Sequence, residues 1–516
     1  MTDILGNELN NNLMLMLPEI ILAVAAVLVV FVDMFQKELK LRAAALPVLT
    51  VLGFIAAGVA SVAAIDQTDH FARLVSIDNF TAFFRITFIG IGIILIIGSH
   101  EYIERHVNHI GEFYGLLLLS TAGAILMASA RDLLIAYLGI EVLSFSLYIA
   151  VSLGKNDPRS GEAGLKYVLL GGVASAMLLY GLSLLYGVAG ATQYDAIATS
   201  LAGGTEGLTM PLLLGLTLIV AGLGFKISAV PFHMWAPDAY EGAPLPVTAY
   251  LSVTSKGATL ALFLRWFGGP LLPAIDQWQW MMALITTATI VVGNLVALQQ
   301  TNVKRLLAYS SIAQGGFMLM AVTVVSDVAA SALLVHLGGY ILTNLALFIA
   351  IIHFYNQSGK EEISDFRGLS RTNPYLATVI TAGLFSLAGM PLLAGFFTKF
   401  VLFQAVVEGG MLWLVVVAVI GSTVSLFYYL QVIRQMYIYD AEGDPTRWSI
   451  SGTGYLTTGV LLAAVVFVGI QGAPLYTVAD RAAYALFGDT QRVAAAGATD
   501  AAKPAAPAAP AKAGGH

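Results

Sequence analysis

The chain alternates between long apolar stretches and short polar or Gly/Pro-rich segments. A membrane-spanning helix needs about 20 mainly apolar residues, and the stretches have roughly that length or more. The pattern therefore predicts about fourteen transmembrane helices. The predicted spans are residues 15–35, 43–65, 79–99, 113–130, 132–152, 163–188, 209–237, 244–267, 278–298, 303–326, 328–355, 374–408, 411–438 and 454–473.

Composition strengthens this prediction. Of 516 residues, 58% are hydrophobic and only 11% are charged, and the mean hydropathy is +0.82. A soluble domain carries about 25% charged residues, so lipid is the solvent that tolerates this deficit. The sequence contains no cysteine, which excludes disulfides, thiolate nucleophiles and cysteine-ligated iron–sulfur clusters in this chain. Lysines and arginines are scattered, so we expect no nucleic-acid partner.

The distribution of basic residues predicts an orientation, because cytoplasmic loops are enriched in Lys and Arg. The loops after odd-numbered spans carry Lys37, Lys40, Arg42, Arg105, Lys155, Arg159, Lys304, Arg305, Lys360, Arg367, Arg371, Arg434 and Arg447. The loops after even-numbered spans hold little beyond Arg73, Arg131 and Arg265. We therefore expect the odd loops in the cytoplasm and both termini on the opposite side. Arg85, Arg265 and Arg434 lie near span ends, where interfacial or structural roles are expected.

Two short matches indicate an internal repeat. Arg131-Asp132-Leu133-Leu134 before Glu141 matches Lys304-Arg305-Leu306-Leu307 before Gln314, at an offset of 173 residues (304 − 131). Ala221-Gly222 before Lys226 matches Ala394-Gly395 before Lys399 at the same offset (399 − 226). Equivalent positions are five spans apart, and an odd number of spans reverses the direction of insertion. The spacing therefore predicts two inverted five-helix repeats, spans 4–8 and 9–13, although short apolar matches also arise by chance.

This organisation divides the chain into five parts. They are an N-terminal three-helix segment (1–112), the first repeat (113–267), the second repeat (268–438), a C-terminal helix region (439–490) and a disordered Ala/Pro-rich tail (491–516). The tail has almost nothing to bury, and its prolines oppose a long helix.

The fourth span of each repeat is unusually long and is interrupted. Pro231 follows Lys226 in span seven, and Gly389-Met390-Pro391 precedes Lys399 in span twelve. Proline removes a backbone donor and clashes with the preceding turn, so each helix is expected to break there. Broken helices are tolerated in membranes where protein or internal water satisfies the backbone. Two unrelated kinks are the alternative explanation.

Ionisable residues inside the predicted spans are the candidate functional groups, since a charge at a helix centre costs roughly 2.5–3.5 kcal/mol. The candidates for proton transfer are Glu141, Lys166, Lys226, Lys256, His336 and Lys399. For each lysine the alternative is a static ion pair or a snorkelling side chain, above all for Lys166 near its helix start. For His336 the alternative is a hydrogen-bonded core histidine.

Helical spacing places polar neighbours beside these candidates. Ser252 and Thr259 share a face with Lys256; other stripes are His336, Tyr340, Thr343 and Asn344, and Ser310 with Gln314. Desolvation favours the neutral form of a buried lysine, and a nearby carboxylate favours its charged form. A pair such as Glu141 and Lys226, whose separation changes, can therefore load and release a proton. We expect these groups to form one wet polar axis across both repeats.

The segment through spans seven and eight carries a specific resemblance. It runs from Lys226 through Val230-Pro231-Phe232-His233-Met234-Trp235-Ala236-Pro237-Asp238-Ala239-Tyr240-Glu241-Gly242-Ala243-Pro244 to Pro246-Val247-Thr248 and Ser255-Lys256. This segment resembles the antiporter-like membrane subunits of respiratory complex I, a family that includes multisubunit cation/proton antiporters. The resemblance covers the predicted spans and leaves out the Ala/Pro tail.

The resemblance implies a function and residue roles. It implies a proton-translocating, non-redox subunit of an NADH:quinone oxidoreductase in a bacterial inner membrane, with both termini periplasmic. Glu141, Lys226, Lys256 and Lys399 match the family's ionisable positions, Lys166 matches a further lysine, and His336 is a less secure match. Partners would be other membrane-arm subunits, including antiporter-like subunit M and the small subunits. Flavin and iron–sulfur clusters would lie in partner subunits, no cofactor is expected in this chain, and NADH and quinone would act only through the whole complex.

Two alternatives to this function remain at the level of sequence. The first alternative is a subunit of a multisubunit cation/proton antiporter without redox partners. The second is a scaffold that anchors its neighbours without pumping.

Overall fold

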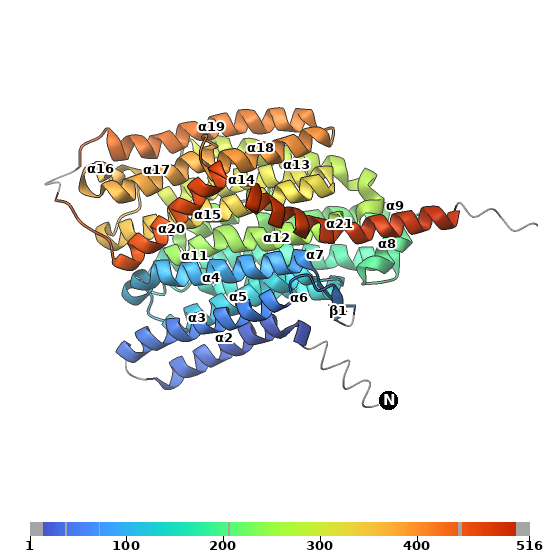
Figure 1. The fold of residues 1–516 in the computed structure, drawn as a ribbon, viewed down its shortest axis with the longest axis horizontal. Helices are drawn as coiled ribbons and strands as arrows, with labels where there is room; N and C mark the ends of the chain where they lie inside the picture. The colour runs from blue at the N-terminus through green and yellow to red at the C-terminus, as the bar shows by residue number, and fades with distance from the viewer. Residues whose placement is uncertain (1–13, 37–38, 72, 205–206, 442–445, 502–516) are drawn as a thin grey trace, which may run out of the picture.

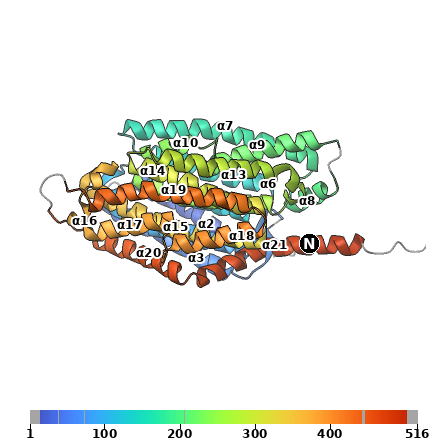
Figure 2. The same ribbon diagram turned by 90° about the horizontal axis from the view of Figure 1, so that it is seen from above.

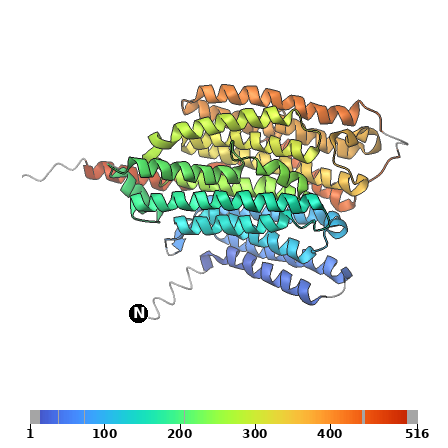
Figure 3. The same cartoon turned by 180° about the vertical axis from the view of Figure 1, so that it is seen from behind.

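The chain folds into a bundle of long helices that run roughly along one common direction (Figure 1). The computed structural model describes residues 14–36, 39–71, 73–204, 207–441 and 446–501. The N-terminal helices lie at one edge of the bundle and the helices near residue 400 at the opposite edge (Figures 1 and 3).

The helices of the N-terminal part and of the first predicted repeat precede residue 270. They are α2 (Leu17–Phe35), α3 (Leu39–Ala63), α4 (Asn79–His106), α5 (Ile110–Ser129), α6 (Leu133–Val151), α7 (Pro158–Ala189), α8 (Tyr194–Ala202), α9 (Thr209–Ile227), α10 (Trp235–Gly242), α11 (Leu245–Tyr250), the π-helix η1 (Leu251–Ser255) and α12 (Lys256–Phe267).

The second predicted repeat and the C-terminal region supply the remaining helices. They are the 3₁₀-helix η2 (Leu272–Ala274), α13 (Ile275–Ala297), α14 (Val303–Val324), α15 (Asp327–Ser358), the 3₁₀-helix η3 (Ile363–Phe366), α16 (Leu369–Thr372), α17 (Pro374–Ala388), α18 (Ala394–Glu408), α19 (Leu412–Tyr437), α20 (Gly452–Ile470) and α21 (Ala473–Ala501).

The predicted membrane spans are confirmed. Thirteen helices within the described residues are long and apolar enough to cross a membrane. Each corresponds to one predicted span, with α11, η1 and α12 together forming span eight. Predicted span twelve is divided between α17 and α18, which are 15 residues each and therefore too short to cross alone. The chain is thus an all-α, multi-pass membrane protein. The inverted relation between the two five-helix sets remains a prediction.

Polar caps set the starts of several spans. Asp132 accepts a hydrogen bond from the Leu134 N–H at the start of α6, and Asn302 accepts from the Lys304 N–H at the start of α14. Ser326 caps α15 through the Ala329 N–H. Such residues satisfy backbone donors that a helix start leaves unpaired. They explain how neighbouring spans can be separated by only a few residues.

The centre of the bundle is built from helices that carry the polar stripes. The apolar windows of the α11–α12 span, α14 and α15 are 100%, 89% and 89% buried, against 33% for α2 and 28% for α20. Long α15 contacts α4, α17, α18, α20 and α21, so it runs through the middle of the molecule (Figure 2). Polar side chains on α12, α14 and α15 therefore face protein and not lipid.

Two buried ion pairs stabilise one end of the bundle, as expected for arginines near span ends. Arg85 donates to Glu19 at 2.7 Å, which joins α4 to α2. The Arg265 guanidinium donates to both carboxylate oxygens of Asp78 at 2.9 Å, and Asp78 also caps α4 through the Thr81 N–H. Burial favours the protonated acid, but the Arg265 charge and these hydrogen bonds hold the pKa of Asp78 below its usual value.

Three elements were not predicted from hydropathy. A short hairpin of β1 (Asp69–Phe71) and β2 (Val75–Ile77) connects α3 to α4, and the short helix α8 follows α7. Helix α21 reaches Ala501, so the prediction of disorder is wrong for residues 491–501. The reason is local, because this segment is rich in alanine and the first tail proline is Pro504. Residues 502–516 of that tail lie outside the described residues.

Candidate functional site

The first helix break lies between α9 and α10, where Pro231 predicts it. Helix α9 ends at Ile227, and Ser228 adopts a left-handed conformation with φ of 62°. The Ala229 N–H donates to the Gly224 carbonyl at 2.7 Å. The Val230 N–H donates to the Thr289 hydroxyl on α13 at 2.9 Å. Backbone donors at this break are therefore satisfied by protein groups, as a break at membrane depth requires.

We expect Thr289→Val to destabilise this break. The substitution keeps the side-chain shape but removes the acceptor for the Val230 N–H, which costs about 1–3 kcal/mol when the donor stays unpaired. Thr287→Val is the matched control, because within the described part of the chain the Thr287 hydroxyl bonds only the Ala283 carbonyl of its own helix. Thermal unfolding of the purified protein in detergent should show a lower midpoint for Thr289→Val alone. Equal midpoints would contradict the assignment.

Lys226 is buried in the last turn of α9 and faces α6. Its ammonium donates to the Ser144 hydroxyl at 2.6 Å and to the Tyr148 hydroxyl at 3.1 Å. Glu141 lies on the same face of α6, three residues before Ser144 and seven before Tyr148. Lys226 and Glu141 do not form a direct ion pair among the described residues; two hydroxyls on the same helix as Glu141 bind the Lys226 ammonium instead. A hydroxyl both donates and accepts, which suits a proton relay.

Ser144 and Tyr148 were not predicted from the sequence, although their helical spacing from Glu141 was a usable signal. Glu141 itself is only partly buried in this chain. Its Oε1 atom is buried and has no protein hydrogen-bond partner among the described residues. Buried polar atoms are normally paired, so this oxygen is a point at which water or a further group would complete the site.

Lys256 opens α12 immediately after the π-helix η1. Its ammonium donates to the Ile227 carbonyl at 2.9 Å, so it binds the C-terminal end of α9. Gly315 on α14 lies so close that a Cβ there would be 3.4 Å from this carbonyl and 3.6 Å from the ammonium. Both lysines therefore lie at the C-terminal end of α9. Lys226 is part of its last turn, and the side chain of Lys256 binds its last carbonyl.

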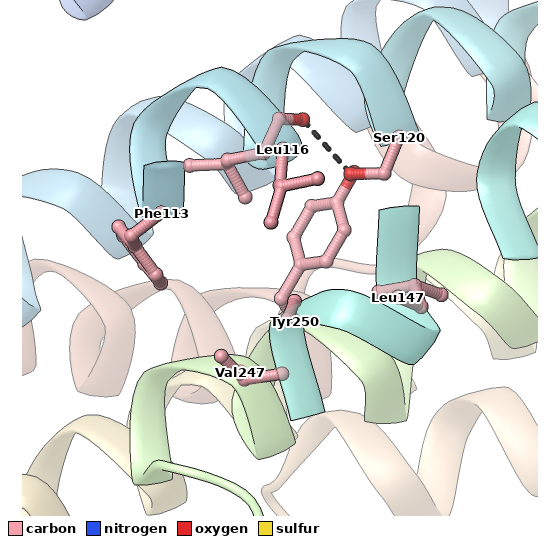
Figure 4. Close-up of a pocket in the computed structure, with 8 residues that line it drawn as sticks. Phe113, Leu116, Ser120, Leu147, Val247 and Tyr250 are labelled. Carbon is pink, nitrogen blue, oxygen red and sulfur yellow. Dashed lines mark hydrogen bonds between the residues drawn. The ribbon is translucent and has the colours of Figure 1, made fainter. Parts of the chain in front are cut away.

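Tyr250 fixes the span just before η1. Figure 4 shows its ring reaching across a small cavity toward Ser120 of α5, with Leu147 of α6 and Val247 beside it. The Tyr250 hydroxyl lies 2.7 Å from the Thr121 hydroxyl and 3.1 Å from that of Ser120. A single π-turn inside a helix is rare, and those that occur are often found at functional sites. Here it directly precedes a buried lysine.

The second break lies between α17 and α18, where Gly389-Met390-Pro391 predicts it. Gly389 has φ of 88°, and the Gly395 N–H donates to the Ser386 hydroxyl at 3.0 Å. The Lys399 ammonium donates to the Leu387 carbonyl at 2.7 Å and to the Ser422 hydroxyl at 3.0 Å. The Gln314 amide donates to the same Leu387 carbonyl at 3.0 Å. Lys399 therefore binds the C-terminal end of α17.

Lys256 and Lys399 share one structural role. Each places an ammonium on a carbonyl at the C-terminal end of the helix that precedes a break. That end carries partial negative charge, and a cation there is stabilised by roughly 0.3–1 kcal/mol, up to about 2 kcal/mol in partly buried sites. Lys226 differs, because it lies before its own break and donates to hydroxyls of α6.

This geometry corrects the residue correspondence drawn from the offset of 173. Lys226 lies before the first break, whereas Lys399 lies after the second. Arg131 precedes α6, whereas Lys304 lies inside α14. The capping residues Asp132 and Asn302 occupy comparable places at an offset of 170. The short matches are therefore not structurally equivalent residue by residue, although both breaks do fall in the fourth span of each set.

His336 on α15 lies beside the second break. Its Nδ1 atom is 3.0 Å from the Thr398 hydroxyl, next to Lys399, and its buried Nε2 has no protein partner among the described residues. One turn along α15, the Tyr340 hydroxyl donates to the Ser252 carbonyl at 3.1 Å. The Ser311 hydroxyl lies 2.6 Å from Tyr340, a contact that the sequence did not reveal. Polar groups of η1, α14 and α15 thus lie close together beside the second break.

Lys166 lies in a different environment from the other predicted lysines. Its side chain is 44% exposed and pairs with Glu162 at 2.7 Å and Asp238 at 2.8 Å. Asp238 on α10 also pairs with Arg305 of α14 at 2.8 Å. Burial raises the pKa of Asp238, but hydrogen bonds and charges from Lys166 and Arg305 outweigh this and hold it below its usual value. Lys166 therefore belongs to an ion-pair group that holds α10.

Comparisons with known proteins agree with this architecture. Residues 130–425 match the family described as "NADH:quinone oxidoreductase/Mrp antiporter, TM". NADH-quinone oxidoreductase subunit N of Dehalococcoides mccartyi is 38% identical over 482 residues, covering 91% of this chain and 98% of the relative. The subunit N of Desulforamulus reducens is 40% identical over 407 residues, covering 79% and 85%.

Solved structures show the same fold. A chain of respiratory complex I from Thermus thermophilus with bound aureothin matches with a TM-score of 0.75 and 29% identity, covering 90% of this chain and 99% of that one. A chain of the Mrp complex from Dietzia sp. matches with a TM-score of 0.81 and 20% identity, covering 94% and 99%. At that identity, the second likeness supports the fold alone.

Proposed function

The chain belongs to the NADH:quinone oxidoreductase/Mrp antiporter membrane family, and from this premise we propose that it translocates protons as an antiporter-like membrane-arm subunit of an NADH:quinone oxidoreductase. Its curated relatives at about 40% identity carry the name of that enzyme's subunit N, whereas the likeness to an Mrp complex is at 20% identity. The redox-driven function is therefore supported over the cation/proton antiporter. The other membrane-arm subunits are its partners.

One observation supports the proposed mechanism most directly. Two buried lysines, Lys256 and Lys399, each bind the open C-terminal end of a broken helix. When such a lysine loses its proton, the interaction with the helix end falls by about 0.3–2 kcal/mol, which alters a two-state equilibrium about twofold to about thirtyfold. A change in lysine charge is thereby linked to the position of a half-helix.

The proposed proton path joins the two breaks. Glu141 exchanges a proton with Lys226 through the Ser144 and Tyr148 hydroxyls, and Lys226 communicates with Lys256 through the end of α9. Groups near Tyr340 and His336 lead on to Lys399. Because electron carriers would lie in partner subunits, coupling to quinone reduction would be electrostatic or conformational and would reach this chain through neighbouring subunits.

Lys166 enters the proposal as a residue that positions α10 near the first break. It bridges Glu162 of α7 and Asp238 of α10, and exposed pairs of this kind contribute about 0–1 kcal/mol each. Its influence on proton transfer would therefore be indirect. The cytoplasmic position of this end of the bundle, and a periplasmic position of both termini, are part of the same proposal.

Substituting the buried lysines tests the function. In the assembled complex reconstituted in vesicles, Lys256→Met and Lys399→Met are each expected to lower NADH-driven proton uptake by at least about tenfold, since a proton-transfer group typically contributes 10²–10⁴-fold. Lys166→Met is the matched control and should lower it by much less. Pumping at the normal rate in Lys256→Met and Lys399→Met would instead favour a scaffold. An equal loss in Lys166→Met would place Lys166 on the proton path.

A further inference from the structure

A polar pocket lies at the C-terminal ends of α13 and α19, apart from the proton path. These two helices pack side by side (Figure 1). Residues that line the pocket include Thr301 after α13, Ser364 of η3, Gln431, Arg434 and Gln435 in the last turns of α19, and Tyr439 just after it. Three segments that are distant in sequence thus bring hydroxyl, amide and guanidinium groups to one place.

The depth of this pocket follows from α19 itself. Trp413 at the start of α19 stacks on Trp280 of α13, with ring centroids 6.3 Å apart, and tryptophans of this kind mark a membrane–water interface. Arg434 lies 21 residues further along the helix (434 − 413). At about 1.5 Å per residue this is about 30 Å, the thickness of the hydrocarbon core. The pocket therefore lies at headgroup level in the opposite leaflet.

Most of the polar side chains that line the pocket have no hydrogen-bond partner within the described residues; an exception is Gln435, whose amide oxygen accepts a hydrogen bond from Arg367 at 3.3 Å. Among the described residues, Arg434 makes no ion pair, and its guanidinium packs over the Tyr439 ring at 5.2 Å. Arg367 packs over the same ring at 5.6 Å, so two guanidinium groups lie around Tyr439. The side chains of Gln431, Thr301 and Ser364 have no hydrogen-bond partner within the described part of the chain. This leaves a cation and several donors facing one cavity.

Below the pocket, α13 and α19 present apolar side chains along their exposed faces. Leu284 and Leu295 of α13 are 67% and 52% exposed, and Ile420 and Phe427 of α19 are each 60% exposed. The alternative is that Arg434 simply extends toward water, as arginines near span ends do. That role would need neither the surrounding hydroxyl and amide groups nor the exposed apolar side chains beside them. Basic pockets between membrane helices are typical binding sites for anionic lipid headgroups.

We propose that this pocket binds the phosphate group of an anionic phospholipid, with its acyl chains along the exposed faces of α13 and α19. Arg434 supplies the charge and charge-assisted hydrogen bonds, and Gln431, Thr301 and Ser364 supply neutral donors to the remaining phosphate oxygens. The recognised chemistry is a phosphate ester. A lipid would bind more tightly than free phosphate, because only its acyl chains contact the exposed apolar side chains of α13 and α19.

Lipid retention by the intact complex tests the proposal. Complexes carrying wild-type chain, Arg434→Gln or Arg159→Gln are exchanged into nanodiscs with equal phosphatidylglycerol and phosphatidylcholine, and bound lipid is counted by native mass spectrometry. Arg159 is a matched control, because it is an arginine at the same end of the bundle, 69% exposed and outside the pocket. Arg434→Gln should weaken phosphatidylglycerol binding by about tenfold or more, and Arg159→Gln should not.

A second variant and a phosphate competition complete the experiment. Gln431→Leu leaves every charge in place and should weaken binding by a smaller factor, which covers the case in which Arg434→Gln fails to assemble. Millimolar inorganic phosphate should not displace the bound lipid from the wild-type complex. Full displacement would identify a free-phosphate site and overturn the lipid assignment. Equal retention in all variants, or equal retention of phosphatidylcholine, would overturn the site itself.

Discussion

Replacing Lys226 by arginine is expected to lower NADH-driven proton pumping by at least about tenfold while the complex still assembles. Arginine keeps the positive charge but does not release its proton in a protein, whereas lysine does. Lys226 faces the hydroxyls of Ser144 and Tyr148, and no carboxylate of the described residues lies at ion-pair distance from it. A fixed charge at this position would therefore block exchange with Glu141 without removing an ion pair.

Two further variants separate proton release from the larger size of arginine. Lys226→His retains a group that can release a proton, so it should keep more pumping than Lys226→Arg. Lys304→Arg is the control for size, because Lys304 is also buried but pairs with Glu361 at 2.7 Å, a contact that arginine preserves. Pumping and NADH oxidation would be measured on the same vesicles. Undiminished pumping in Lys226→Arg would leave Lys226 only a static role.

Removing the Asp78 carboxylate is expected to destabilise the protein by about 3–5 kcal/mol. Asp78→Ala would leave the Arg265 guanidinium buried without its counter-charge and would remove the cap of α4. Arg265 would keep its hydrogen bonds to the Thr81 hydroxyl and the Ala128 carbonyl, which do not replace a full negative charge. The measured quantity is the thermal unfolding midpoint of the purified protein in detergent.

A surface pair provides the matched control for Asp78→Ala. Arg131 and Asp195 also form an Arg–Asp pair, at 2.7 Å, but Asp195 is 78% exposed. Asp195→Ala should therefore cost no more than about 1 kcal/mol. The double variant Asp78→Ala with Arg265→Leu should recover part of the loss, because no unpaired charge remains buried. Similar midpoints for Asp78→Ala and Asp195→Ala would contradict a stabilising buried pair.

The pH dependence of this contribution has a definite sign. The pKa of Asp78 is held below its usual value in the folded protein, so the folded state favours the ionised carboxylate. The stabilisation is then fully present above the unfolded pKa and is lost as the pH falls through the folded pKa. Wild-type protein should lose more stability than Asp78→Ala when the pH is lowered below about 4.

The sequence by itself determined the membrane spans, the two breaks and four of the buried ionisable residues, Lys226, Lys256, His336 and Lys399. Hydropathy is a local property summed along one helix, and proline and glycine break a helix through their own backbone chemistry, so neither result needs knowledge of neighbours. The caps at Asp132 and Ser326 are equally local, since their acceptors serve the next turn of their own helix, but they were identified only in the structure. Local chemistry was misleading for the tail, where α21 extends to Ala501.

Only the tertiary structure decided which groups meet. The sequence paired Lys226 with Lys399 by an offset, but the fold gives Lys256 and Lys399 the shared position on helix ends. It placed Ser144 and Tyr148 at the Lys226 ammonium and left Lys166 in an exposed ion-pair group. Hydrogen bonds depend on distances of about 3 Å between different helices. Periodicity fixes the face of a residue on its own helix, but helix packing decides what that face meets.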